Sequence, residues 1–277
     1  MAKARRNQLW LHGFLILSVV VLAFPVIFAL TVSSQSPTDV FVFPPKFSPG
    51  RYALENYAQA WTQVNMGRLL FNSAVISIVV SVAKIVLSLL AAFAFTYFGR
   101  FRGQYLIFIM ILVTHMLPLP IRIVPTFELM QTLDWVDTYQ ALTVPFFASA
   151  TGTLLYRQVF LTVPLSLADS ARIDGSGPIG FLFRILLPLS RTNTAALFMI
   201  EFIYMWNQYL WPLVVTNSAS MKVVQIGLKM LLASEAQAAD WNVIMAGTII
   251  AMLPALLVLF LLQGAFVKGF AMREDKA

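Results

Sequence analysis

Six long apolar segments constrain this chain more than any other feature of its sequence. They cover residues 9–32, 69–97, 105–130, 141–160, 192–215 and 242–267. Each reaches the length of about 20 apolar residues that a helix needs to cross the hydrocarbon core of a bilayer. Because a backbone in lipid must satisfy its own hydrogen bonds, such segments are expected to be helices. The sequence therefore predicts an all-α membrane protein with six transmembrane helices.

The composition agrees with this class and excludes several kinds of chemistry. Apolar residues make up 59% of the 277 positions and charged residues only 11%, values outside the range of soluble domains. Cysteine is absent, so disulfides and thiolate sites are excluded. The two histidines, His12 and His115, are too few for a histidine-based metal site.

The first apolar segment has two interpretations. Lys3, Arg5 and Arg6 precede it, as they would in a signal peptide. However, the segment is longer than a usual signal core, and it ends at residues 31–37 without a small-x-small cleavage site. We therefore expect an uncleaved membrane anchor.

The orientation follows from the distribution of basic residues. With a cytoplasmic N-terminus, the inner segments hold twelve Lys and Arg residues and the outer segments hold five. The outer five are Lys46, Arg51, Arg68, Lys222 and Lys229. Since basic residues accumulate on the cytoplasmic side, both termini are predicted to be cytoplasmic. The net charge of +7 is then explained by topology and does not indicate nucleic-acid binding.

Three regions are expected along the chain. Residues 1–68 supply one transmembrane helix and a Pro-rich outer loop, residues 69–270 form a five-helix core, and residues 271–277 form a cytoplasmic tail. The aromatic side chains of Tyr52, Tyr57 and Trp61 are expected at the outer membrane interface.

A polar stretch interrupts the apolar sequence between the fourth and fifth predicted helices. Within the cytoplasmic loop 161–191, Pro164 and Ser166 indicate a helix start, with Ser166 and Asp169 spaced as an acidic capping box. Gly175 is placed to end this helix, and Pro178 can open a second one. A short helix on the membrane face can insert into a partner and transmit its rigid-body motion. The alternative is an ordinary interfacial helix whose charges are simply solvated.

The residues of this stretch resemble a known motif. The chain reads Asp-Ser-Ala-Arg-Ile-Asp-Gly-Ser over 169–176, followed at the expected offsets by Ile185, Leu187 and Pro188. This is similar to the docking loop of permeases of binding-protein-dependent ABC importers of the carbohydrate type. Asp169 replaces the family's Glu, and two family Ala positions are Ser. The resemblance implies that a cytoplasmic coupling helix contacts the ATPase through Asp169, Ser170, Ala171, Arg172, Asp174 and Gly175.

The resemblance also implies an assembly. The sequence has no Gly-x-x-x-x-Gly-Lys-Ser/Thr phosphate loop, so ATP and magnesium would be bound by a separate ATPase, and this chain would hold no cofactor and would not be an enzyme. The expected partners are an ATPase dimer, a second related permease subunit, and a periplasmic or lipid-anchored solute-binding protein. The expected location is the bacterial inner membrane, as a multi-pass protein.

Further stretches bear on the substrate. Residues 122–126, 148–151, 156–160 and 206–212 resemble those of family members that import sn-glycerol 3-phosphate, which implies this compound or a glycerophosphodiester as the substrate. A neutral sugar or polyol is the alternative within the family. A stand-alone secondary transporter would be expected to show paired repeats, and an intramembrane hydrolase a motif such as Gly-x-Ser-x-Gly. Neither feature is found in the sequence.

Four ionisable residues fall within the predicted helices and need partners or water: Lys84, Arg122, Glu128 and Glu201. Lys84 is expected to reach the interface or to pair across the bundle. Arg122 lies among Pro118, Pro120 and Pro125, which should break the helix and leave backbone groups lining protein or a cavity. Its guanidinium could bind a phosphate bidentately, anchor the helix at the interface, or pair with Glu201 or Glu128.

The fifth predicted helix carries further candidates for a substrate pathway. Glu201 is followed by Tyr204, Trp206, Asn207 and Gln208, whose amides could donate to substrate hydroxyls while the aromatic rings line a wall. The alternative is an aromatic belt at the interface with amides that bridge helices.

Overall fold

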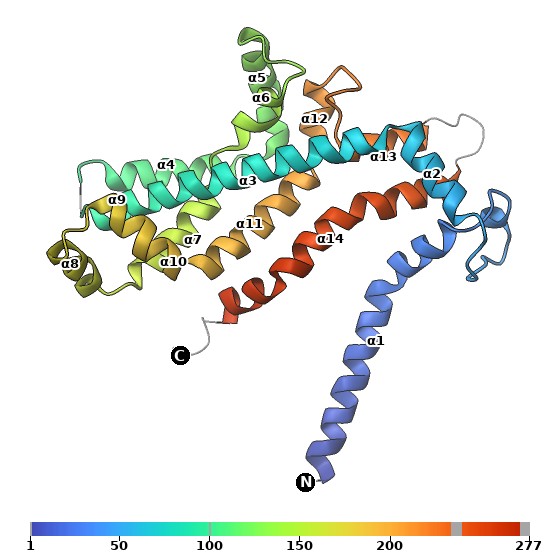
Figure 1. The fold of residues 1–277 in the computed structure, drawn as a ribbon, viewed down its shortest axis with the longest axis horizontal. Helices are drawn as coiled ribbons and strands as arrows, with labels where there is room; N and C mark the ends of the chain where they lie inside the picture. The colour runs from blue at the N-terminus through green and yellow to red at the C-terminus, as the bar shows by residue number, and fades with distance from the viewer. Residues whose placement is uncertain (1, 100, 234–239, 272–277) are drawn as a thin grey trace. The chain divides into compact units, whose positions relative to one another are not determined.

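All regular structure in the described part of the chain is helical. The structure, a computed structural model, describes residues 2–99, 101–233 and 240–271 (Figure 1). The elements are α1 (Ala2–Val32), η1 (Asp39–Phe41), α2 (Ala53–Gln63), α3 (Met66–Tyr97), α4 (Gln104–Met116), α5 (Leu119–Thr132), α6 (Tyr139–Thr143), η2 (Val144–Phe146), α7 (Ala150–Leu161), α8 (Leu165–Ile173), α9 (Pro178–Phe181), η3 (Leu182–Leu186), α10 (Leu187–Leu189), α11 (Arg191–Trp206), α12 (Leu210–Val215), α13 (Val224–Ala233) and α14 (Trp241–Ala271). The predicted tail lies outside the described residues except for Ala271.

Three of the predicted membrane segments are single long helices. Trp10–Val32 of α1, Met66–Tyr97 of α3 and Trp241–Ala265 of α14 are each long and apolar enough to cross a bilayer. Helices α4 and α5 pass the same test only as a pair, bent by 100°. The described residues thus contain three such helices, or four with the bent pair.

The other predicted segments are interrupted, and prolines explain two of the interruptions. The third segment breaks between α4 and α5, where Pro118 holds the preceding Leu117 in an extended conformation (φ −74°, ψ 114°). The fourth breaks near Pro145 into α6, η2 and α7. The fifth breaks at residues 207–209, between α11 and α12. A hydropathy pattern measures apolar length and cannot locate such breaks, so the count of six stays a prediction.

The chain divides into two compact units. The first contains Met1–Gly67 and Gly227–Leu253, and the second contains Arg68–Ile226 and Pro254–Ala277. The boundaries expected from topology, at residues 68 and 270, describe the order of elements along the chain and stay predictions.

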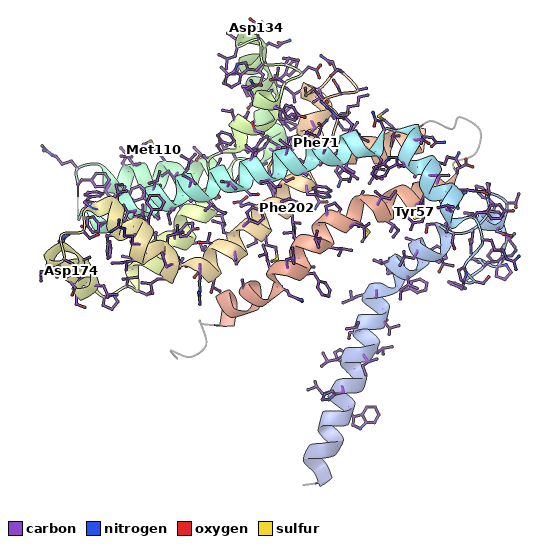
Figure 2. The ribbon with its side chains drawn as sticks, in the orientation of Figure 1. Tyr57, Phe71, Met110, Asp134, Asp174 and Phe202 are labelled. Carbon is purple, nitrogen blue, oxygen red and sulfur yellow. The ribbon has the colours of Figure 1, made fainter. Side chains whose placement is uncertain are left out.

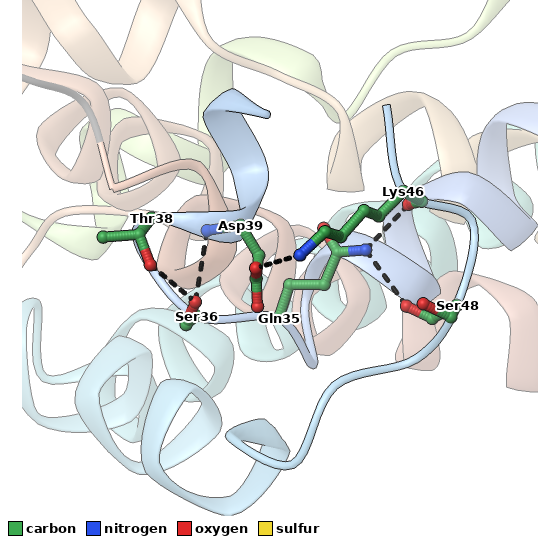
Figure 3. A network of polar contacts seen from close by, with 6 residues as sticks. All are labelled: Gln35, Ser36, Thr38, Asp39, Lys46 and Ser48. Atoms are coloured by element: carbon green, nitrogen blue, oxygen red, sulfur yellow. Dashed lines mark hydrogen bonds and ion pairs between the residues drawn. The ribbon is translucent and has the colours of Figure 1, made fainter. Parts of the chain in front are cut away.

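In the first unit, the loop predicted to lie outside the membrane is held by polar contacts (Figure 3). Gln35 donates from Nε2 to the carbonyl oxygens of Lys46 (2.8 Å) and Ser48 (3.1 Å). Lys46 forms an ion pair with Asp39 at 2.5 Å. The hydrogen bond from Lys46, helped by one from Ser36, holds the pKa of Asp39 below its usual value. The Pro-rich loop is therefore held in a defined conformation by the hydrogen bonds of Gln35 and by the ion pair between Lys46 and Asp39.

Asn56 of α2 fixes this loop to the helices of the same unit. Its buried side chain donates from Nδ2 to the carbonyl oxygens of Ser33 and Gln35, both at 2.9 Å. Its Oδ1 accepts a hydrogen bond from Asn242 of α14 at 2.8 Å. One amide thus satisfies backbone groups at the end of α1 and also joins α2 to α14.

Replacing this amide by an apolar group of similar size tests its role. Asn56→Leu leaves two carbonyl oxygens and one amide without their partner, and each buried group left unpaired costs about 1–3 kcal/mol. We expect faster proteolysis of residues 33–52 and a lower melting temperature in detergent. The control is Gln59→Leu, at an exposed position of the same helix. Equal behaviour of the two variants would contradict this role for Asn56.

In the second unit, α3 has a different environment at each of its ends. Near Tyr97, buried side chains from α3, α7, α8, α9, η3 and α11 form one apolar core. At the other end, Asn72 donates to the carbonyl oxygens of Ser220 and Lys222, both at 2.8 Å, and accepts from the Tyr139 hydroxyl at 2.6 Å. In Figure 2, the label Phe71 lies on α3 toward the Asn72 end, and the label Asp174 marks the end of α8, which packs near Tyr97. A helix of 32 residues separates the two ends by about 48 Å.

Candidate functional site

A cavity with both charged and apolar lining residues lies within the second unit, where the interrupted helices meet α3 and α11. Its volume is about 710 Å³. The breaks themselves line it, through residues 117–119 between α4 and α5 and through residues 145–146 and 148–151 before and at the start of α7. From α3, the positions Lys84, Leu87, Ser88 and Ala91 face it, as expected for one side of a helix. Non-helical backbone at membrane depth is tolerated where it lines such a cavity.

A buried ion pair is the central polar contact of this cavity. Lys84 of α3 and Glu201 of α11 meet at 2.6 Å between Nζ and Oε2. Their side chains are only 8% and 7% exposed. The ammonium group also lies 4.8 Å from the ring centroid of Tyr204. Because each charge would be costly to bury alone, the pair holds α3 against α11.

Ser149 connects the ion pair to α7. Its hydroxyl donates to Glu201 Oε1 at 2.7 Å and accepts the Gly152 amide at 3.0 Å, so it serves as the N-cap of α7. Ser88 of α3 donates to the Ser149 carbonyl oxygen at 3.1 Å. A Cβ atom at Gly152 would lie 2.4 Å from Ser88 Oγ, so glycine permits this close approach of α7 to α3. Helices α3, α7 and α11 are thereby joined at one point.

Arg122 of α5 also lines the cavity. The ion pairs with Glu201 or Glu128 that the sequence suggested for it are not formed among the described residues. Glu201 pairs with Lys84 instead, and Glu128 is exposed. The Nε atom of Arg122 is buried and has no hydrogen-bond partner among the described residues. A guanidinium donor in such a position is available to a ligand.

The candidates on the fifth predicted segment separate into two groups. Glu201 and Tyr204, three residues apart, share the face of α11 that lines the cavity. The other three, Trp206, Asn207 and Gln208, are not among the described lining residues. Trp206 is buried against Phe202, with ring centroids 5.6 Å apart, and Asn207 caps α11 by donating to the Ile203 carbonyl oxygen.

Two residues of the cavity were not selected as site candidates by the sequence. Lys84 was recognised as an intramembrane charge in need of a partner, but its partner is 117 residues away along the chain. Ser149 carries no signal of its own, because serine is common in both loops and helix caps. Its position before Ala-Thr-Gly and after Pro145 is consistent with a helix start.

The ion pair allows a direct test. Lys84→Met leaves Glu201 buried without its counter-ion and is expected to destabilise the fold by about 3–5 kcal/mol. The double variant Lys84→Met, Glu201→Met removes both charges and should regain most of the lost stability. Thermal denaturation in detergent compares the two. A double variant no more stable than the single one would show that the pair does not account for the loss.

At the Tyr97 end of α3, the predicted docking residues form the short exposed helix α8. The helix begins at Leu165, with Pro164 as its N-cap. The predicted capping box is wrong, because Ser166 lies inside the helix and the cap makes no side-chain hydrogen bond. The predicted end at Gly175 is confirmed: Gly175 has φ +75°, and the amides of Gly175 and Ser176 donate to the carbonyl oxygens of Arg172 and Ala171. These two bonds form a Schellman motif.

The side chains of α8 divide sharply between core and solvent. Ala171 is buried in the apolar core, whereas Asp169, Ser170, Arg172 and Asp174 are exposed. Arg172 pairs with Asp169 at 3.1 Å and donates from Nε to the Tyr97 hydroxyl at 3.3 Å. The hydrogen bond to Tyr97 contributes most to raising the pKa of Arg172 above its ordinary value. The helix thus presents a charged face while Ala171, with the partly buried Ala168, packs against the core.

A second helical segment follows this helix. It begins at Pro178, as the sequence predicts, and α9 passes into a five-residue π-helix, η3, before α10. Phe181, Leu182 and Leu186 of this segment are buried with Ala171 in the same core. Helix α8 is therefore packed on elements that continue directly into α11.

A helical chain with a partly polar cavity lined by broken helices, and with an exposed charged helix at one end of its second unit, has the features of a membrane transporter subunit. Residues 84–272 match the family described as "Binding-protein-dependent transport system inner membrane component". The chain belongs to this family. It is a multi-pass protein of the inner membrane.

Similar proteins support this assignment. The chain is 44% identical over 270 residues to the sn-glycerol-3-phosphate transport system permease protein UgpE of Agrobacterium fabrum, covering 95% of each chain. It is 40% identical over 281 residues to the protein of that name from Yersinia enterocolitica, covering 99% of this chain and all of the other. Among solved structures, a bacterial ABC transporter for import of the acidic polysaccharide alginate contains a chain with a TM-score of 0.84 at 19% identity. That match covers 96% of this chain and 98% of the other, and it shows the fold.

Proposed function

We propose that this chain is a permease subunit of an ABC importer for sn-glycerol 3-phosphate or glycerophosphodiesters. The main support for this substrate is sequence identity: the chain is 40–44% identical, over nearly its whole length, to permeases of sn-glycerol-3-phosphate transport systems. The cavity supports it, because an arginine with a free buried donor lines a space of about 710 Å³, within the usual size range of small-molecule sites.

The same proposal includes six membrane crossings with both termini in the cytoplasm. The two ends of α3 support it, because the predicted docking loop packs near Tyr97 while Arg68 and Asn72 bind the loop at Ser220. A helix of about 48 Å is longer than the hydrocarbon core, so its ends belong on opposite sides of the membrane. The breaks in the third, fourth and fifth segments are then interruptions inside crossings.

The importer would contain further subunits. This chain would pair with a second related permease, bind one subunit of an ATPase dimer that holds ATP and magnesium, and receive substrate from a periplasmic or lipid-anchored solute-binding protein. The solute-binding partner is supported by a bacterial alginate ABC transporter of similar fold, which was solved in complex with a periplasmic protein that holds an alginate pentasaccharide. On α3, the exposed apolar side chains of Ile78, Val79, Val82 and Val86 suit lipid or the second permease.

The docking helix would couple hydrolysis to transport. The exposed residues Asp169, Ser170, Arg172, Asp174 and Gly175 would contact the ATPase, with Ala171 anchoring them from below. Closure of the ATPase dimer would move α8 as a rigid body and turn the cavity outward, and hydrolysis would return it inward.

Reconstitution tests the substrate. ATP hydrolysis by the assembled complex with its binding protein is measured against glycerol 3-phosphate, glycerophosphocholine and a neutral disaccharide. We expect stimulation by the two phosphate compounds alone. Stimulation by the disaccharide would agree with the assignment as an ABC importer but would contradict the proposed substrate.

A pair of glycine variants tests the coupling. A Cβ atom at Gly175 or at Gly177 meets nothing within 4 Å, but only Gly175 has a positive φ, of +75°. Gly175→Val is therefore expected to strain the end of α8 by about 1–2 kcal/mol or more, and to lower uptake per ATP hydrolysed while the complex still assembles. Gly177→Val is the control. Unchanged uptake in Gly175→Val would mean that the loop is passive.

A further inference from the structure

The cavity carries an uneven set of charges. Three charged side chains line it: Lys84, Arg122 and Glu201. Lys84 and Glu201 neutralise each other at 2.6 Å, whereas Arg122 has no ion pair among the described residues. One unit of positive charge is therefore left facing a space that Ser88, Thr114 and Ser149 make partly polar.

We infer that Arg122 and Lys84 together form a binding site for a phosphoryl anion inside the permease. The inference rests on the proposed function and goes beyond it, because it places selectivity for the phosphorylated substrate in this chain as well as in the binding protein. The anion supplies the counter-charge that Arg122 lacks. Lys84, already inside the same cavity, contributes a second cation at the cost of sharing its ammonium group between Glu201 and the substrate.

The two cations suit this task in different ways. A guanidinium offers a planar fork of donors that matches two phosphate oxygens, and its unpartnered Nε is part of that fork. An ammonium group has three donors, and that of Lys84 uses one of them in its hydrogen bond to Glu201 Oε2. Its other two donors are left for a phosphate oxygen in the cavity, so binding requires neither loss of the ion pair nor transfer of a proton.

Glu201 has a complementary position. Its Oε1 accepts from Ser149 and its Oε2 accepts from Lys84, so both oxygens are held in fixed directions. A carboxylate at the same cavity repels a second anion but accepts hydrogen bonds from hydroxyl groups. A glycerol moiety carries such hydroxyls beside its phosphate. The site therefore orients the phosphoryl end toward Arg122 and Lys84 and the hydroxyl end toward Glu201.

A purely structural role for the pair makes a different prediction. A buried ion pair that only joins two helices can often be replaced by a well-packed apolar pair without loss of stability. The double variant Lys84→Met, Glu201→Met keeps α3 and α11 in contact but removes the ammonium group. Arg122→Gln removes the guanidinium charge from α5. The control is Arg157→Gln, which removes a cation stacked 4.9 Å over Phe108 of the same unit and outside the cavity lining.

Two measurements on the assembled transporter test the site. The first is uptake into proteoliposomes at saturating binding protein, with co-purification of all subunits as proof of assembly. The second is the melting temperature of the complex without binding protein, titrated with glycerol 3-phosphate, glycerophosphocholine, inorganic phosphate and glycerol. We expect the three phosphate compounds, but not glycerol, to stabilise the wild-type complex.

In Arg122→Gln and in the double variant, this stabilisation should disappear. Uptake should fall about tenfold or more, as expected for the loss of a charged hydrogen bond, with Arg157→Gln like wild type. Assembled variants that keep wild-type uptake and phosphate stabilisation would overturn the site while leaving the proposed function intact. A wild-type complex that transports only neutral compounds and responds to no phosphate would overturn both.

Discussion

The ion pair between Lys84 and Glu201 is the contact on which the arrangement of the second unit depends. It lies where burial makes an isolated charge very unfavourable, so neither side chain can leave without the other. Through Ser149, the same carboxylate also fixes the start of α7. Three helices that are distant in sequence are thereby held in one register by two side chains and a hydroxyl group. The cavity is the space that remains beside this junction.

The breaks in the helices are consistent with this arrangement. A continuous helix satisfies its own backbone, whereas a helix interrupted at Leu117 or before Ser149 leaves amides and carbonyl groups that require polar surroundings. The cavity provides such surroundings beside both breaks. Pro118 and Pro145 lie near these breaks, where backbone polar groups are left without helical partners. The breaks and the buried ion pair therefore both add polar groups to this part of an otherwise apolar chain.

The sequence predicted the features that depend on local properties. The length of the apolar segments was sufficient to predict the long helices α1, α3 and α14. The preference of glycine for a positive φ was sufficient to predict that α8 ends at Gly175. It could not predict the partner of Lys84, because pairing over 117 residues depends on how helices pack. The start of α8 was placed within a residue but for the wrong reason, since Pro164 rather than a Ser166 capping box begins it. Trp206 and Asn207 were grouped with Glu201 because they are close in sequence, but the rotation of α11 turns them away from the cavity.

The single buried residue of the docking motif has a consequence for how such a protein can change over time. Only Ala171 of the six predicted docking residues contributes to the apolar core, and the other five are exposed. Substitutions at Asp169, Ser170 and Asp174 leave the packing below intact, so this part of the surface can diverge while the core stays the same. Arg172 and Gly175 are more constrained, because Arg172 contacts Tyr97 and Gly175 has a positive φ. Under the proposed function, the surface offered to an ATPase could therefore change independently of the residues that line the cavity.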